Sequence, residues 1–307
     1  MDESWRLAGK QGALRRRAMM IRAIRRFFCD RDYLEVETPV RIPAPAPEEY
    51  IDAVPSGAWF LQTSPELCMK RLVAAGYPRL FQISKCFRAC ERGRLHLPEF
   101  TMLEWYRKGG NCETLMQECE DLILSVARTL DGNDTLAYQG MTIALQPPWE
   151  RISVADAFAR YASLSMQEAL EKDSFDEMIA CRIEPCLKGG RPVFLYDFPV
   201  ARGALARAKR SDPELAERFE LFMGGLELAN AFSELTDEKE QRLRFEKAQR
   251  IRRAAGKAAY PMPEPFLSSL RYMPEAAGIA IGVDRLAMLF TDSASIDEII
   301  AFTPEML

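Results

Sequence analysis

The chain has 307 residues, of which 48% are hydrophobic, and it carries a formal net charge of −4 at pH 7 with a single histidine and eight cysteines. This length can bury one large core or two small ones, while the acidic balance counts against a broad contact with a nucleic-acid backbone. The chain shows no apolar run of about 18 residues, no signal-peptide pattern, no C-x-x-C pair and no His-rich metal site, so we expect a cytoplasmic globular protein with reduced thiols and no membrane span.

The N-terminal part of the chain predicts one helix followed by extended structure. Residues 13–29 place apolar side chains at helical spacing with arginines on the other side, which is typical of an amphipathic helix. We interpret the arginine run as a solvated or subunit-facing surface. Residues 33–40 predict a short strand that Pro39 ends, and the proline-rich residues 41–50 predict a loop.

A long hairpin is predicted from two strand-like runs, 79–88 and 99–107, which flank a charged loop. Arg88 lies where the first run enters the loop, and its planar guanidinium suits a bidentate contact with a phosphate or a carboxylate. A surface hairpin held by cross-strand ion pairs is the alternative. In the second run, strand alternation directs four side chains to one face, namely Phe100, Met102, Glu104 and Tyr106.

Helical patterns dominate the segments around the remaining strands. Residues 112–130 predict a second amphipathic helix, 151–190 predict short helical pieces to which no chemistry can be assigned, and 236–257 predict a highly charged helix. The simplest organisation is a single α+β domain over residues 1–307, in which helices cover an antiparallel sheet. The apolar side chains expected to join the charged helix to the body are Leu243, Phe245 and Ile251.

A second hairpin is predicted around the two-residue turn Gly224–Gly225. Pairing about this turn places Glu220 diagonal to Glu227 on one face, with the carbon frames about 7 to 8 Å apart. Two such carboxylates can share magnesium ions and phosphates, but they are costly to bury without them. Asn230 and Glu234 follow at the end of the second strand or just beyond it. A sheet face open to water is the alternative.

The third notable segment is GIAIGVDRLAMLF, residues 278–290, in which an apolar strand reaches Gly282 and a helix begins near Asp284. Arg285 falls in the first turn of this helix, where backbone N–H groups and the helix dipole favour an anion. A cation there opposes the dipole. We therefore expect Arg285 to reach a phosphate.

These segments together carry a family resemblance. The stretches at 37–39 (ETP), 87–88 with 98–106 (FR and PEFTMLEWY) and 282–285 (GVDR) resemble motifs 1, 2 and 3 of class II aminoacyl-tRNA synthetases. The stretches 63–72 and 219–237 are similar to the lysine-specific branch. Lysyl-tRNA synthetases carry an N-terminal anticodon-binding barrel, for which the residues before the first helix leave no room. A catalytic domain without this barrel, together with the sequences LEWYR and AFTPEML, resembles the elongation factor P lysine ligase family.

The resemblance implies both a fold and a reaction. The fold is a class II synthetase-like antiparallel β-sheet flanked by helices, without an anticodon-binding domain. The implied enzyme activates (R)-β-lysine, or lysine, with ATP and Mg²⁺ as an aminoacyl adenylate. It then transfers the aminoacyl group to a lysine side chain of elongation factor P. A homodimer is expected by analogy, and tRNA is not expected as a partner.

The resemblance also assigns a nucleotide site. Arg88 would neutralise the substrate carboxylate and the α-phosphate, and Arg285 would hold the γ-phosphate of a bent ATP. The adenine ring would lie between Phe100 below and Arg285 above. Glu220 and Glu227 would hold Mg²⁺. The other positions that match the family's nucleotide contacts are Ala89, Cys90, Glu91, Leu97, Glu227, Leu228 and Gly282.

An amino-acid site is implied next to the nucleotide. Glu66 would bind the backbone-type ammonium, while Glu234 and Tyr106 would receive the side-chain ammonium. A buried carboxylate of this kind selects strongly for a diamino acid. The full set matched to the family is Ser64, Pro65, Glu66, Glu104, Tyr106, Asn230 and Glu234.

Three departures from the family pattern leave other interpretations open. Ala89 and Cys90 replace an Asn-Glu pair, Leu97 replaces an asparagine, and Glu91 follows one position late for reading adenine. His96 is either a structural hydrogen-bonding group or an ATP contact. The alternatives are a truncated lysyl-tRNA synthetase-like enzyme that charges tRNA or a small-molecule acceptor, and a non-catalytic paralogue that binds ATP and an amino acid.

Overall fold

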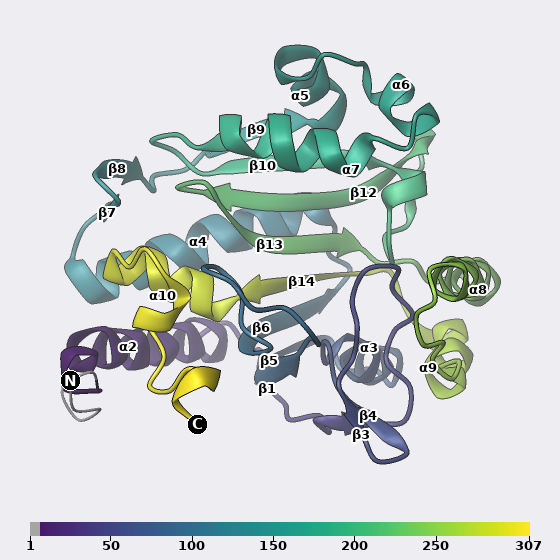
Figure 1. The fold of residues 1–307 in the computed structure, drawn as a ribbon, viewed down its shortest axis with the longest axis horizontal. Coiled ribbons are helices and arrows are strands. Elements are labelled where there is room, and N and C mark those ends of the chain that lie inside the picture. Colours follow the sequence, from purple (N-terminus) through teal and green to yellow (C-terminus); the bar gives the residue numbers. More distant parts are fainter. Residues whose placement is uncertain (1–6) are drawn as a thin grey trace.

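The computed structural model describes residues 7–307 (Figure 1). Residues 1–6, which belong to the predicted domain and to the segment searched for a signal peptide, lie outside the described residues. The main feature is a nine-stranded sheet in the order β1-β5-β6-β14-β13-β12-β10-β9, with β11 paired to β12. Its pairs are antiparallel except for β1–β5 and β9–β10. The strands are β1 (Leu34–Glu35), β5 (Arg79–Phe87), β6 (Glu99–Lys108), β9 (Glu150–Ser153), β10 (Val193–Pro199), β11 (Ala208–Lys209), β12 (Asp212–Met223), β13 (Leu226–Ser233) and β14 (Ala276–Gly282).

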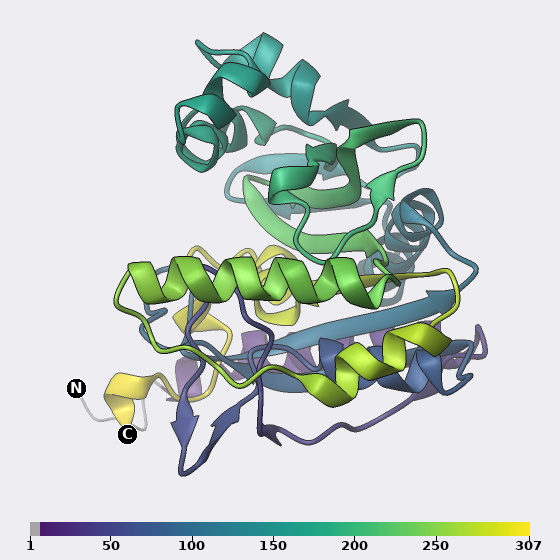
Figure 2. The same cartoon turned by 90° about the vertical axis from the view of Figure 1, so that its right-hand side faces the viewer.

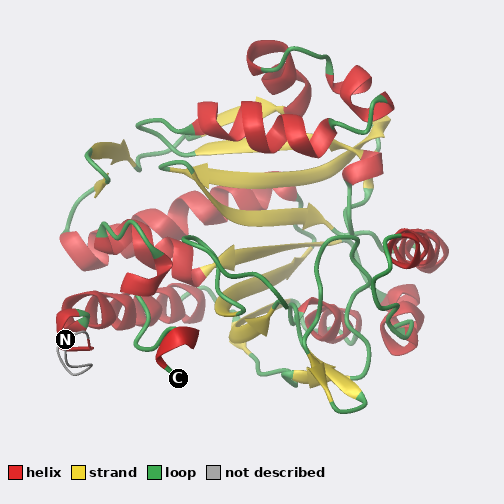
Figure 3. Cartoon of the chain, viewed as in Figure 1, coloured by secondary structure: helices red, strands yellow, loops and turns green. Residues whose placement is uncertain are grey.

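Helices pack around this sheet in separate groups, as the red and yellow elements of Figure 3 show. The largest hydrophobic core lies between the sheet and the helices α2 (Gln11–Cys29), α4 (Cys112–Asp131) and α10 (Val283–Thr291). Within it Phe28 of α2 stacks on Phe81 of β5, with ring centroids 4.7 Å apart. The predicted amphipathic helices at 13–29 and 112–130 are thus confirmed, and Gly132 in the left-handed conformation ends the second one.

Two further cores cover other parts of the sheet. One joins α3 (Glu66–Ala74), α8 (Glu238–Ala254) and α9 (Glu264–Ser269) to β5, β6 and β14. The other packs α5 (Val154–Tyr161), α6 (Met166–Glu171) and α7 (Phe175–Met178) on β10. Figure 2 shows α8 and α9 side by side, with the α5–α7 group above them in this view. The helical pieces predicted over 151–190 are confirmed.

The remaining elements are short. A three-stranded sheet contains β2 (Arg41–Ile42), β3 (Pro55–Ser56) and β4 (Trp59–Leu61), and β7 (Thr135–Tyr138) pairs with β8 (Met141–Ala144). A π-helical turn at Ile179–Ile183 continues into a 3₁₀ turn at Glu184–Leu187. Other 3₁₀ turns lie at Val200–Arg202, Leu270–Tyr272, Ile296–Glu298 and Pro304–Met306. Over residues 7–307, none of the helices combines the length and the apolar character that crossing a bilayer requires.

The sequence-based elements need three corrections. The strand predicted over 33–40 shrinks to the two residues of β1, and the proline-rich stretch 41–50 begins with the short strand β2. Leu243 is not buried against the body, since the residue is 63% exposed. Helix α8 instead turns Phe245 and several polar residues inward, including the buried Arg252.

The second hairpin has the predicted turn, and next to it Met223 pairs with Leu226 and Phe222 pairs with Glu227, as expected for a two-residue turn; the register shifts only beyond these pairs. Gly224 and Gly225 have φ angles of +61° and +82°, which suit glycine in a two-residue turn. Past the turn, a bulge leaves Leu228 unpaired, so Glu220 lies opposite Asn230. Glu220 still lies two residues before Phe222, the partner of Glu227, and both glutamates line the same cavity, so the bulge leaves them on one face of the hairpin.

Candidate active site

A cavity of about 790 Å³ opens over the exposed face of β6, β12, β13 and β14. Helix α8, the turn at Val200–Arg202 and the loop at 47–51 complete its walls. The cavity brings together residues that lie more than 200 positions apart, such as Ser64 and Arg285. Most predicted site residues line this one space. Those that do not line it are Pro65, Ala89, Cys90 and Glu234.

Arg88 and Phe100 form one end of the cavity. The Arg88 guanidinium carbon lies 5.1 Å from the centroid of the Phe100 ring, at the cation–π range, and Nη1 lies 3.7 Å from Glu91 Oε2. The buried Nε of Arg88 has no hydrogen-bond partner among the described residues. A buried donor without a partner carries a cost of about 1 to 3 kcal/mol, which an anionic ligand would remove.

Arg285 is held at the same end by four groups. Its Nε donates to the Leu95 backbone oxygen at 3.4 Å. Its Nη1 donates to the Glu227 backbone oxygen at 2.7 Å and lies 3.4 Å from Glu227 Oε2. Its Nη2 lies 2.6 Å from His96 Nε2, which must accept because a guanidinium only donates. Burial and the Arg285 charge lower the pKa of His96, which favours this neutral acceptor form. His96 is therefore placed as a structural partner that orients Arg285.

Two carboxylates, Glu220 and Glu227, face the cavity between these arginines and the floor of the sheet. Burial raises the pKa of Glu220 to about 7, with Glu227 and Glu184 adding to the rise and Arg218 opposing it. Arg218 Nη2 lies 2.5 Å from Glu220 Oε1. A cation near Glu220 and Glu227 would relieve their repulsion, so these residues fit a magnesium ion.

Magnesium would need further oxygen ligands at this place. No group of three or more His, Cys, Asp or Glu side chains within residues 7–307 is arranged to hold a metal ion. Magnesium in nucleotide sites is commonly bound by one or two carboxylates together with substrate phosphates. Glu220 and Glu227 provide the protein part of such a site.

The opposite end of the cavity is rich in buried acids. Glu104 accepts hydrogen bonds from Ser64 Oγ at 2.5 Å and from the Tyr106 hydroxyl at 3.0 Å. Burial and the nearby Glu66 raise the pKa of Glu104 to about 8. Neighbouring carboxylates in a desolvated region attract cations, so this end suits an ammonium group.

Lys70 is the residue that the sequence interpretation missed here. Its side chain is 1% exposed, and its Nζ lies 2.5 Å from both Glu66 Oε1 and Glu234 Oε2. Lys70 lies on the same face of α3 as Glu66, four residues later, a spacing that resembles an ordinary surface ion pair. The Lys70 ammonium instead lies buried between two carboxylates, those of Glu66 and Glu234.

Glu234 lies just behind the cavity wall. Its side chain is 1% exposed, and neither carboxylate oxygen has a partner with hydrogen-bond geometry in residues 7–307, although Lys70 lies near Oε2. The tight neighbours on the cavity side are Gly278 and Tyr106, since a β-carbon added at Gly278 would collide with the Tyr106 ring and with Glu234 Oε1. Because Lys70 pairs with Oε2, Glu234 Oε1 is the oxygen that remains to accept a hydrogen bond from a substrate ammonium.

We expect Gly278→Ala to weaken binding of the amino acid. The new methyl group would overlap Tyr106 and Glu234 and must displace one of them, because the contacts are shorter than real β-carbons tolerate. Overpacking of this kind costs about 1 to 3 kcal/mol, so the KM for the amino acid should rise by about 10-fold or more. Steady-state kinetics with varied amino acid and fixed ATP would measure it.

Gly189→Ala is the matched control, since its added β-carbon meets nothing within 4 Å and Gly189 does not line the cavity. Equal KM values for the two alanine variants would contradict the assigned role of Gly278.

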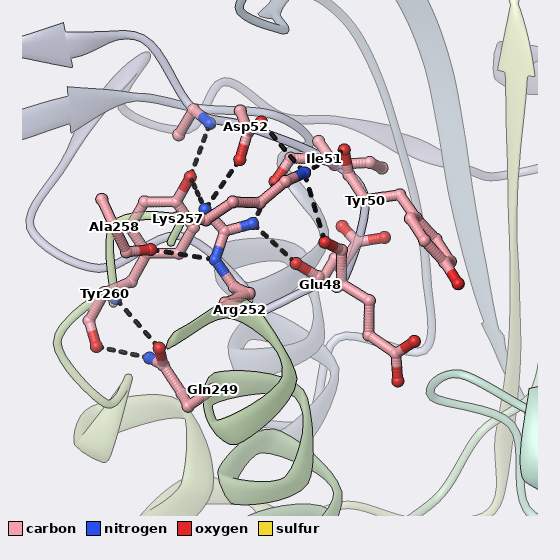
Figure 4. A network of polar contacts seen from close by, with 11 residues as sticks. Glu48, Tyr50, Ile51, Asp52, Gln249, Arg252, Lys257, Ala258 and Tyr260 are labelled. Atoms are coloured by element: carbon pink, nitrogen blue, oxygen red, sulfur yellow. Dashed lines mark hydrogen bonds and ion pairs between the residues drawn. The ribbon is translucent and has the colours of Figure 1, made fainter. Parts of the chain in front are cut away.

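A buried arginine holds the loop at 48–52 beside the cavity (Figure 4). Arg252 of α8 is 1% exposed, and its Nη1 donates to the backbone oxygens of Glu48 at 2.8 Å and Ile51 at 2.9 Å. Its Nη2 donates to Asp52 Oδ1 at 2.7 Å and to the Tyr260 hydroxyl at 2.8 Å.

The same loop holds the segment that follows β5. The backbone N–H of Ala89 donates to the backbone oxygen of Asp52 at 2.7 Å. Cys90 next to it is exposed and has a φ of +64°. The structure therefore places Ala89 and Cys90 outside the cavity wall, with Glu91 and Leu97 on it.

The antiparallel sheet and this two-ended cavity define a catalytic domain of the class II synthetase type. A family model of class II tRNA synthetases (D, K and N) matches residues 4–306, and the chain belongs to this family.

Among curated proteins, the chain is 37% identical to the elongation factor P–(R)-β-lysine ligase of Hamiltonella defensa and 38% identical to that of Pectobacterium carotovorum. Each alignment covers 98% of both chains. It is also 39% identical to the lysine–tRNA ligase of an Anaeromyxobacter species, over 96% of this chain and 65% of that protein. These relatives confirm the predicted resemblance and identify the chain as a ligase of this family.

Proposed function

We propose that the chain activates (R)-β-lysine, or lysine, with ATP and transfers the aminoacyl group to a lysine side chain of elongation factor P. The observation that carries this proposal is the division of one cavity into two ends. Arg88 and Arg285 offer positive charge at one end, while the other end offers the carboxyl groups of Glu66 and Glu104 on its wall and that of Glu234 just behind it. The names of the relatives that match along nearly their whole length support the same reaction.

The first half-reaction requires positioning and charge neutralisation. The substrate carboxylate attacks the α-phosphate of ATP, and Arg88 would lie between these two anions. Glu220 and Glu227 would hold Mg²⁺, which supplies charge neutralisation for the phosphates. Because the substrate carboxylate is already ionised, no protein base is needed for this step.

An ATP–pyrophosphate exchange assay tests adenylate formation. We expect exchange with (R)-β-lysine, L-lysine or both, and absence of exchange with every amino acid tried would reject the enzyme and leave a non-catalytic binding protein. Mass spectrometry of elongation factor P and of tRNA after incubation identifies the acceptor. Because the chain is also similar to lysine–tRNA ligases, aminoacylated tRNA with unmodified elongation factor P would favour the tRNA-charging alternative.

The proposal includes an assembly and a location. By family resemblance, α2 and the segment around Pro39 would form a homodimer interface, and tRNA would not be the physiological acceptor. Since elongation factor P is a translation factor, the reaction would occur in the cytoplasm. Light scattering of the purified protein measures the oligomeric state directly.

A further inference from the structure

The carboxylate of Glu48 lies in the cavity wall and takes no part in the proposed binding of ATP, Mg²⁺ or the amino acid. Glu48 follows the proline-rich stretch and is partly exposed to the cavity. Burial acts on its carboxylate together with nearby charges, and none of the hydrogen bonds among residues 7–307 involves this carboxylate. The charged groups that face it are Arg88 after β5, Glu66 of α3, Arg218 of β12 and Glu91 of the charged loop.

The neighbours of Glu48 come from both ends of the cavity. Arg88 belongs to the nucleotide end, and Glu66 belongs to the amino-acid end. In an aminoacyl adenylate, the reactive carbonyl carbon is the atom that joins these two parts of the molecule. Glu48 thus faces the junction at which a second substrate must attack.

The backbone of Glu48 is fixed although its side chain is free. Arg252 binds the Glu48 backbone oxygen, as Figure 4 shows, and makes no contact with its carboxylate among the hydrogen bonds of residues 7–307. Lys257 Nζ also donates to the backbone oxygens of Glu49 and Tyr50, at 3.4 Å and 3.3 Å. A carboxylate on such a fixed loop is pre-organised to meet an incoming group.

Building on the proposed function, we infer that Glu48 is the proton acceptor for the acceptor lysine in the transfer step. The lysine ammonium gives one proton to a Glu48 carboxylate oxygen, and its nitrogen then attacks the carbonyl carbon of the adenylate. A C–N bond forms, and the C–O bond to phosphate breaks with its electron pair on AMP. The second proton lost by the nitrogen passes to the leaving phosphate, which balances the reaction.

The electrostatics of Glu48 suit a base that works near neutral pH. Burial raises the pKa of Glu48 to about 7, with Arg88 opposing the rise and Glu66 adding to it. A base is most effective when its pKa lies near the working pH. The carboxylate is protonated below this pKa, so the transfer rate should rise as the pH passes upward through about 7 and then level off.

The test compares the two half-reactions in Glu48→Gln. Exchange of pyrophosphate reports adenylate formation, and single-turnover transfer to elongation factor P, followed by mass spectrometry, reports the second step. We expect the ratio of transfer rate to exchange rate to fall by about 100-fold, as loss of a general base typically causes. The levelling-off near pH 7 should be lost in Glu48→Gln, because transfer would then follow the free-amine fraction of the acceptor lysine, which keeps growing up to a pKa of about 10.

Two controls separate proton transfer from a general disturbance. Hydroxylamine is unprotonated at neutral pH and needs no base, so its attack on the adenylate should proceed equally in wild type and Glu48→Gln. Glu49→Gln removes the neighbouring charge of the same loop and should keep the wild-type ratio for elongation factor P.

The possible outcomes are distinguishable. An unchanged ratio and pH profile in Glu48→Gln, or an equal loss with hydroxylamine, would overturn the assignment of Glu48. A wild-type protein without any exchange would instead reject the proposed function itself.

Discussion

Replacing Arg88 by alanine should reduce turnover by about 100-fold or more, as loss of a transition-state anion contact usually does. Arg88 lies over the Phe100 ring, and its buried Nε has no partner in residues 7–307. Its planar group is thus placed to contact an anion that lies against the aromatic ring. Stopped-flow or exchange kinetics at saturating ATP would measure the loss in rate.

Arg92→Ala provides the control from the same loop. Arg92 pairs with Asp297 at 2.9 Å and with Glu305 at 2.7 Å, and these exposed ion pairs do not line the cavity. Exposed pairs contribute about 0 to 1 kcal/mol to stability, so this variant should keep its rate. If Arg88→Ala retained the wild-type rate, the charged hairpin would not form the nucleotide site.

Replacing Glu234 by glutamine should lower the affinity for the amino acid by several kcal/mol, about 3 to 5, because it removes one partner of a desolvated charge interaction. The amide keeps the volume of the side chain but cannot neutralise a substrate ammonium. Lys70 would also keep only Glu66 as a charge partner. Titration of exchange activity against amino-acid concentration measures the change.

A second buried glutamate shows whether the loss is specific. Glu120 is 5% exposed and accepts a hydrogen bond from the Trp149 backbone N–H at 2.9 Å, away from the cavity. Glu120→Gln should therefore saturate with the amino acid at the wild-type concentration, even if its thermal stability falls. Near-normal saturation in Glu234→Gln would reject the role assigned to Glu234.

The parts of the fold that the sequence predicted correctly have strong local signals. Strand alternation marks β5 and β6, and the glycine pair marks the turn between β12 and β13. The apolar strand and helix around Gly282 are equally clear, and α10 begins at Val283. These segments converge on one cavity, so the candidate site could be assembled before its geometry was known.

The residues that were missed have no distinctive pattern of their own. The bulge at Leu228 inserts one residue without a glycine or proline to mark it. Lys70 and Arg252 belong to helices in which charged side chains are common, and their burial depends on partners far away in the sequence. Glu48 follows a proline-rich stretch, whose composition predicts a loop but not the direction of one side chain.

Arg252 holds the loop at 48–52 largely through backbone atoms, which affects how far the side chains of this loop can differ among related enzymes. Its Nη1 binds backbone oxygens of Glu48 and Ile51, and every residue type carries such an oxygen. The backbone path of the loop therefore does not depend on which side chains the loop carries at these two positions. Evolution or a protein engineer can exchange the side chains of Tyr50 and Ile51 to suit a different acceptor, while Glu48 and the path of the loop stay the same.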